Sequence, residues 1–419
     1  MPIEHIELGR RIRQAREACG MTQDQVAEKL GVSRSVIVQI EQGKRPVSGL
    51  ELQKLAYLFA RDIREFLAEE FAEDDVVHVL FRSHEDVGDD AVKHTLRDCI
   101  ALGHELTNLE ELLGISRASV TVATYSLSTP RSRWEAIQVG EQVAREERRR
   151  LGLGSAPLGD IVTILESQGI RTGTVSLPEV VSGLMVSHPK VGLFVVINGN
   201  HAAVRQRFSW CHEYSHALLD KETKGLISKE TDRDNLREVR ANSFAANFLL
   251  PEEGVRQFVA SLGKGASSRL YAEIFDEAGT VPIDSRTEPG TQEIQLYDVV
   301  QLAHTYGVSV PSTLYRLRNL KLLSEREFEH LKTLDAQGRS YKIQQLLDLP
   351  PLDFEKHRSE FHHRFITLAL EALRREKISR AKFLELADRI GIHRLHAETL
   401  IETAGIDEDE AEPVLLPGD

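Results

Sequence analysis

The sequence has 419 residues, of which 41% are hydrophobic and 28% are charged, and its formal net charge is −13 at pH 7. Hydrophobic content of this size is ample for folded cores, and the length is typical of about two to four domains. The negative charge argues against a protein that coats nucleic acid along its whole surface, so any such contact should be confined to a local basic region.

The first predicted domain, residues 6–68, is all-helical. Thr22 and Gln25 have the spacing of a capping box, which begins a helix, and Gly31 suits the tight turn that ends it. A second short helix is predicted over residues 34–41. Helix, glycine turn and helix together predict a helix-turn-helix, whose second helix enters the major groove of DNA.

Residues 8–66 resemble the Cro/C1-type (XRE) helix-turn-helix family. The motifs that carry the resemblance are Met21-Thr22-Gln23, Val26-Ala27, Leu30-Gly31-Val32-Ser33, Ile40-Glu41-Gln42-Gly43 and Lys44-Arg45-Pro46. The resemblance implies a double-stranded DNA operator as partner. It places Arg34, Ser35 and Gln39 at base-reading positions and Gln23, Lys44 and Arg45 near phosphates.

The charge of this segment agrees with that expectation. From Leu8 to Ser48 there are eight Lys or Arg against four Asp or Glu, a balance of +4. A basic region within an acidic chain fits DNA binding. A palindromic operator would require a homodimer.

Residues 69–130 are predicted to form an acidic linker and a connecting helix. The helix spans residues 91–113, and its apolar stripe contains Leu102, Leu106, Leu109 and Leu113. A stripe of this kind is more often ordinary core than a partner face.

The sequence His212-Glu213-Tyr214-Ser215-His216 has the H-E-x-x-H pattern. On a helix, the two histidines lie one turn apart on one face and reach a single metal ion, while Glu213 is free to polarise a metal-bound water. Glu238 falls on the apolar stripe of a later helix. Because a buried carboxylate needs a partner, it supplies the third ligand that a Zn²⁺ site requires. Mn²⁺ stays the alternative metal.

The run from Arg205 to Leu219, the E-x-x-A-N-x-F-A run from Glu238 and the closing Leu249-Leu250-Pro251 resemble the ImmA/IrrE family of metallopeptidases. The resemblance implies a zincin-like α+β domain over residues 131–260, with His212, His216 and Glu238 as ligands and Glu213 as general base. Asn242 stands where many related enzymes carry an aspartate that orients a ligand histidine. Tyr214, His188 and His201 are equal candidates for stabilising the oxyanion.

Residues 290–405 are predicted to form a helical C-terminal region. The spacing over residues 296–333 resembles a second helix-turn-helix, for which we expect a packing role, and an acidic end follows residue 405.

The predicted fold class is therefore α+β and mostly helical. Three scattered cysteines, no basic leader and no apolar run of membrane-spanning length predict a cytoplasmic protein without membrane contact. Two functions stay open. One is a DNA-bound regulator whose zinc endopeptidase domain cleaves a repressor-type partner, or itself, in a stress or mobile-element response. The other is a non-proteolytic transcription factor that uses the peptidase-like domain to sense a small molecule or metal.

Overall fold

The structure is a computed structural model of the whole chain. It describes residues 3–59, 61, 63–68, 90–115, 122–125, 127, 129–188, 192–221, 223, 225–229, 232, 234–265, 269–276, 279–286, 292–350 and 357–406. Most of the predicted acidic linker, the side chain of His188 and the acidic C-terminal end lie outside the described residues. None of the described helices is long and apolar enough to cross a membrane.

The N-terminal domain packs five helices around one apolar core. They are α1 (His5–Ala18), α2 (Gln23–Leu30), α3 (Arg34–Glu41), α4 (Gly49–Leu58) and α5 (Ile63–Leu67). Thr22 and Gln25 form the predicted capping box, and Gly31 ends α2 at φ 71°. Gly9 lets α1 approach α3 closely, because a Cβ atom at this position would lie 2.4 Å from the carbonyl oxygen of Ile40.

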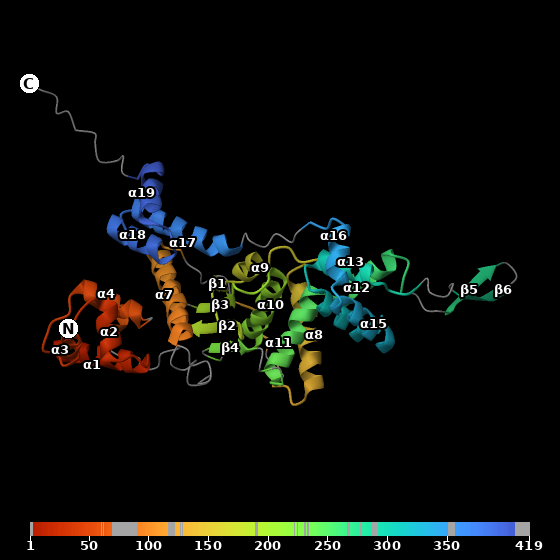
Figure 1. Ribbon diagram of the computed structural model, residues 1–419, viewed down its shortest axis with the longest axis horizontal. Helices are drawn as coiled ribbons and strands as arrows, with labels where there is room; N and C mark the ends of the chain where they lie inside the picture. The colour runs from red at the N-terminus through yellow and green to blue at the C-terminus, as the bar shows by residue number, and fades with distance from the viewer. Residues whose placement is uncertain are drawn as a thin grey trace, which may run out of the picture.

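A single long helix, α7 (Asp90–Leu112), connects three parts of the molecule (Figure 1). Its leucine stripe is core, since Leu106, Leu109 and Leu113 pack in one cluster with Phe365 and Phe383. The partner helices are α17 (His357–Arg374), α18 (Arg380–Arg389) and α19 (Arg394–Thr403). Helices about 250 residues apart in the chain therefore form one bundle.

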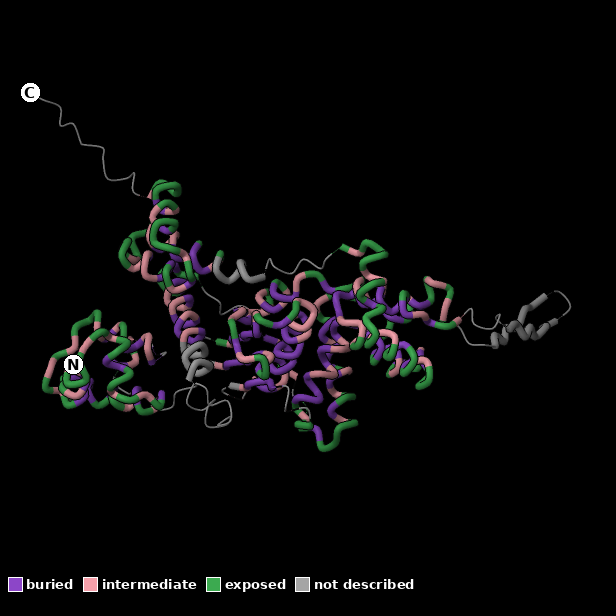
Figure 2. The backbone as a smooth tube through the Cα atoms, viewed as in Figure 1, coloured by how far each residue is buried: buried purple, intermediate pink, exposed green. Residues whose placement is uncertain are grey.

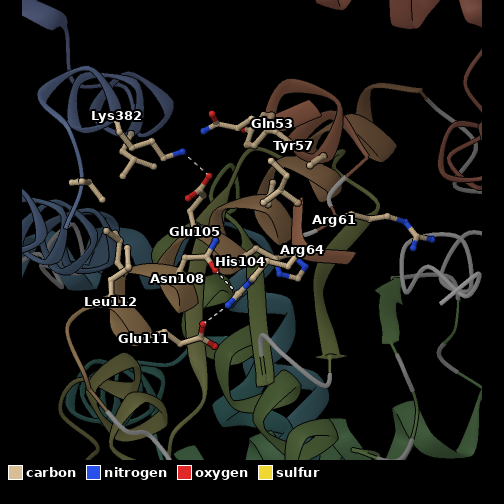
Figure 3. Close-up of a pocket in the computed structure, with 16 residues that line it drawn as sticks. Gln53, Tyr57, Arg61, Arg64, His104, Glu105, Asn108, Glu111, Leu112 and Lys382 are labelled. Carbon is tan, nitrogen blue, oxygen red and sulfur yellow. Dashed lines mark hydrogen bonds and ion pairs between the residues drawn. The ribbon is translucent and has the colours of Figure 1, made fainter. Parts of the chain in front are cut away.

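The N-terminal domain contacts this bundle through α4 and α5. Arg64 forms an ion pair with Glu111 at 2.8 Å, and its Nη2 donates to Asn108 at 2.8 Å. A cavity of about 540 Å³ lies at this junction, lined from α4, α5, α7 and α18. The Lys382–Glu105 ion pair (2.9 Å) lies on one side of it (Figure 3). Helix α3 lies on the far side of the domain from α7 (Figure 1), so its outer face is open to DNA.

The central domain is built on a four-stranded sheet of order β1-β3-β2-β4. The strands are β1 (Arg171–Val175), β2 (Val181–His188), β3 (Gly192–Asn198) and β4 (Gly225–Lys229). Strand β1 is parallel to β3, whereas β2 is antiparallel to both of its neighbours. Alternate residues of β3 face opposite ways, so that Val195 and Ile197 join the main core while Phe194 and Val196 pack in a second core with Cys99 of α7.

Four helices complete the central layer. These are α8 (Arg133–Arg150), α9 (Ile161–Ser167), α10 (Ala203–Leu219) and α11 (Leu236–Leu249). Helix α10 packs on β2 and β3, and α11 packs between α10 and α8. Figure 2 shows that buried residues concentrate here.

The remaining elements extend this core. They are α12 (Glu252–Ser261), β5 (Arg269–Asp276), β6 (Gly279–Arg286), α13 (Leu296–Tyr306), α14 (Val310–Asn319), α15 (Glu325–Ala336) and α16 (Arg339–Leu346). Strands β5 and β6 pair as a separate antiparallel hairpin. Because one core cluster runs from Val122 to Leu331, α13–α15 pack on the central domain, and the predicted α+β, mostly helical fold class is confirmed.

Candidate metal centre and DNA-binding surface

Three predicted ligand side chains meet where α10 packs against α11. His212 Nε2 and His216 Nε2 lie 3.2 Å apart. Glu238 approaches from α11, with Oε2 3.0 Å from His212 Nε2 and Oε1 3.3 Å from His216 Nε2. All three residues are buried, and no other group of His, Cys, Asp or Glu with metal-ligand spacing occurs among the residues that the structure describes.

The outer nitrogens of the two imidazoles orient them. His212 Nδ1 lies 3.0 Å from Asn242 Oδ1, and His216 Nδ1 lies 2.8 Å from Asp220 Oδ2. Asp220 in turn accepts a hydrogen bond from Arg240 at 2.6 Å. Because the Nδ1 atom of each ring faces an oxygen acceptor, a proton is favoured on each Nδ1, and the Nε2 atoms of both rings are directed toward Glu238.

This donor set fits a divalent cation. Lone pairs of two imidazoles and a carboxylate repel one another unless a positive charge lies between them. Bonds of about 2.0 Å in a tetrahedral zinc site place ligand atoms about 3.3 Å apart. The observed separations of 3.0, 3.2 and 3.3 Å are close to that value.

The ionisation of the cluster reflects its carboxylates. Burial by itself would lower the pKa of His216, but hydrogen bonds to Asp220 and Glu238 outweigh it and raise that pKa to about 10. Burial would raise the pKa of Glu238, and the two histidines instead hold it well below its usual range. The cluster therefore retains a positive charge beside Glu238, and a bound cation would take the place of that proton.

Glu213 lies beside the cluster and is fully buried. Burial raises the pKa of its carboxyl group, although His212 and His216 oppose the shift. The hydroxyl group of Ser228 in β4 is close enough to Glu213 to lower this pKa, but the two groups do not have the geometry of a hydrogen bond. Neither carboxylate oxygen of Glu213 has a hydrogen-bonding partner among the described residues. A buried carboxyl group without a hydrogen-bonding partner destabilises the folded protein, so the position of Glu213 indicates a chemical role and not a structural one.

Gly183 of β2 makes room for Glu213. A Cβ atom at this position would lie 2.8 Å from Glu213 Oε1 and 3.0 Å from the carbonyl oxygen of Val196. A larger residue would therefore displace either the carboxylate or the sheet.

Two of the three oxyanion candidates have other roles. The Tyr214 hydroxyl donates to the buried Glu147, and its ring packs against Phe244 and Phe248, so this side chain faces away from the cluster. His201 lies in the turn before α10, and its Nε2 atom is 3.1 Å from the carbonyl oxygen of Glu179. The structure thus removes Tyr214 as a candidate, because its hydroxyl is committed to Glu147.

Sequence reasoning missed Asp220 and Glu147. Asp220 follows His216 by four residues, which is the spacing of side chains on one helix face, and this signal was available. Glu147 lies 67 residues from Tyr214 in the chain, and no local pattern joins them. It also accepts hydrogen bonds from Tyr125 (2.7 Å) and Arg150 (2.8 Å).

The predicted DNA-contacting residues fall into two groups. Arg34, Ser35, Gln39 and Lys44 are exposed on α3 and the turn that follows it. Within this group, Arg34 Nε lies 3.7 Å from the exposed Asp24, and Ser35 Oγ lies 2.8 Å from Ser33 Oγ. Gln23 and Arg45 are only partly exposed and donate to carboxylates of this chain: Gln23 Nε2 to Glu41 at 2.8 Å, and Arg45 Nη2 to Glu51 at 2.9 Å.

Comparison with known families finds two matching segments in this chain. Residues 12–66 match a family described as helix-turn-helix, and residues 165–318 match a peptidase family described as the IrrE N-terminal-like domain. The chain thus combines a segment similar to helix-turn-helix domains with a segment similar to IrrE N-terminal-like domains. The matched IrrE-like segment contains His212, His216 and Glu238 and ends at residue 318, within α14. No curated protein matches the sequence.

Proposed function

We propose that the protein is a DNA-bound regulator with a zinc-dependent endopeptidase domain. Its substrate is a repressor-type protein or the chain itself, cleaved in a stress or mobile-element response. The observation that carries the proposal is the convergence of two histidines and Glu238 beside the unpartnered carboxyl group of Glu213.

His212, His216 and Glu238 would hold the ion, and two nitrogens with one oxygen suit Zn²⁺, with Mn²⁺ as the alternative. A bound divalent cation would supply Lewis acidity for a water molecule and for the peptide carbonyl. Glu213 would act as the general base that takes a proton from the attacking water and gives it to the leaving amine. Its raised pKa suits this work, because a general base acts best when its pKa is near the working pH.

The sheet edge offers a place for the substrate backbone. The order β1-β3-β2-β4 leaves β4 at an edge, and no strand among the described residues pairs with its outer side. An extended peptide adds to such an edge through main-chain hydrogen bonds. Ser228 of β4 is near Glu213, so a peptide along β4 would bring a carbonyl group close to the base.

The helix-turn-helix domain would recognise an operator in double-stranded DNA. Arg34, Ser35 and Gln39 would read base edges in the major groove, where Arg suits guanine and Gln suits adenine. Lys44 would contact phosphate directly. Gln23 and Arg45 would do so after releasing Glu41 and Glu51, or while bonded to them through their remaining donors.

The test compares wild type with Glu213→Gln, each with its bound metal quantified. Both proteins are incubated with repressors encoded by neighbouring genes, and intact mass spectrometry detects products. We expect equal metal content and a discrete cut by wild type alone. Equal metal with no cut by either protein would reject the peptidase and leave the non-proteolytic sensor.

A further inference from the structure

An open cavity of about 780 Å³ lies where the C-terminal end of α8 meets the start of α12. Its wall includes Asn247 of α11, nine residues after Glu238, which corresponds to about 13 Å along a helix. The cavity is therefore separate from the metal cluster. Five arginines line it against three glutamates, an excess of two positive charges: Arg145, Arg148, Arg149, Arg256 and Arg316 against Glu141, Glu252 and Glu253.

Arg316 of α14 is a buried positive charge in this wall. Its residue is only 7% exposed, and its Nε donates to the carbonyl oxygen of Leu250 at 2.9 Å. The two Nη atoms have no hydrogen-bonding partner among the described residues and are not sealed from solvent, so they open into the cavity. No carboxylate among the described residues lies within ion-pair distance of the Arg316 guanidinium group. Burial lowers the pKa of Arg316, and the nearby Glu141 and Glu252 do not offset the shift.

Arg148 of α8 adds a second buried positive charge. It is 3% exposed and donates to the carbonyl oxygens of Gly154 at 2.8 Å, Phe248 at 2.5 Å and Ala156. Carbonyl oxygens satisfy its hydrogen bonds but bring no negative charge. Because arginine keeps its proton in proteins, two buried guanidinium groups without carboxylate partners favour an external anion.

The N-terminus of α12 faces the same space. Helix α12 begins at Glu252 after Pro251, and no side chain caps it. Pro251, Glu252 and Glu253 all line the cavity. The uncapped amide groups of a first helical turn carry partial positive charge and are a common place for an anion to bind.

We propose that this cavity binds the phosphate group of a small phosphorylated molecule. The Nη atoms of Arg316 form a two-pronged contact with the phosphate oxygens, which is the geometry that a guanidinium group favours. Arg145 and Arg149 contact the phosphate from the rim. The excess of two positive charges matches a phosphate dianion, and a volume of about 780 Å³ leaves room for the rest of an organic molecule.

The first experiment titrates the full-length protein with inorganic phosphate and with phenyl phosphate, by calorimetry against sodium chloride of equal ionic strength. We expect both probes to bind wild type. Tighter binding of phenyl phosphate would identify an organic ligand, and equal binding would identify the free ion. Heats no larger than those of chloride for both probes would overturn the proposal.

Variants assign the binding to this cavity. Arg316→Met keeps the length of the aliphatic stem and should weaken binding by about tenfold or more, while the exposed Arg339→Met on α16 should not change it. Because Arg316 is buried, the variant Arg145→Met/Arg149→Met is a second test that alters only exposed rim residues. Wild-type affinity in both cavity variants would place the phosphate elsewhere and overturn the proposal. Neither metal nor peptide cleavage enters these readouts.

Discussion

At the scale of single residues, the site depends on side chains that orient other side chains. Asn242 and Asp220 occupy equivalent places behind His212 and His216, but only Asp220 carries a charge and is itself held by Arg240. An amide oxygen accepts the same hydrogen bond as a carboxylate without making the imidazole as strong a donor to a metal. The two histidines are therefore supported unequally.

Asp220→Asn should weaken zinc binding by about 10- to 100-fold, because the variant removes the charge behind His216 and leaves the ligands in place. Competition with a chelating dye would measure the zinc affinity. The matched control is Asp234→Asn, since Asp234 is fully exposed and pairs only with the exposed Arg133. An unchanged affinity in Asp220→Asn would contradict a positioning role for this carboxylate.

At the scale of elements, close approaches between neighbouring helices and strands determine which side chains face outward and which are buried. Helix α3 presents Arg34, Ser35 and Gln39 outward because Ile37 and Ile40 anchor its other face in the core. Helix α10 similarly buries its H-E-x-x-H turn between β2 and α11. In each case a glycine on the neighbouring element, Gly9 or Gly183, provides the space.

Gly9→Ala should destabilise the helix-turn-helix domain by about 1–3 kcal/mol, because the added Cβ would meet the backbone of α3. DNA binding should weaken while the metal content stays at the wild-type value. Thermal unfolding and a DNA-binding titration would measure both effects. Gly49→Ala is the control, since a Cβ atom there meets nothing within 4 Å.

Gln39→Ala should cost about 1–3 kcal/mol of operator affinity and relax specificity at one base pair. Lys44→Ala should weaken binding to all sequences alike and reduce the slope of log affinity against log salt by about 1. Fluorescence anisotropy over a range of salt concentrations would separate the two. A base-specific loss in the lysine variant would argue against its role as a phosphate contact.

At the scale of the whole molecule, α7 joins the DNA-binding domain, the C-terminal bundle and the sheet. Leu106 and Leu109 enter the bundle core, Cys99 and Ile100 enter the core under the sheet, and Glu111 pairs with Arg64 of the N-terminal domain. A movement of α7 would therefore change all three contacts together.

The thiol of Cys99 should report such a movement. It is 4% exposed, and burial raises its pKa to about 12, so a thiol reagent should leave it unmodified in the native protein at pH 8. Cys19 and Cys211 are also buried, and all three thiols should react after unfolding. Mass spectrometry of alkylated peptides would show this; rapid native labelling of Cys99 would mean that α7 separates readily from the sheet.

Local patterns in the sequence determined much of this protein. The capping box at Thr22, the glycine turn at Gly31 and the one-turn spacing of His212 and His216 all act within a few residues, where helical geometry decides the outcome. Glu238 could be inferred because a carboxylate on an apolar stripe needs a partner.

Only the tertiary structure decided the rest, because its contacts join residues that no short pattern relates. It committed the Tyr214 hydroxyl to Glu147, 67 residues away, and so removed one of the three oxyanion candidates that the sequence left equal. It joined α7 to α17–α19, about 250 residues further along the chain, through apolar packing, and a leucine stripe does not specify its partner helices. It also left the Nη atoms of Arg316 facing a cavity, since the burial of a charge depends on every element packed around it.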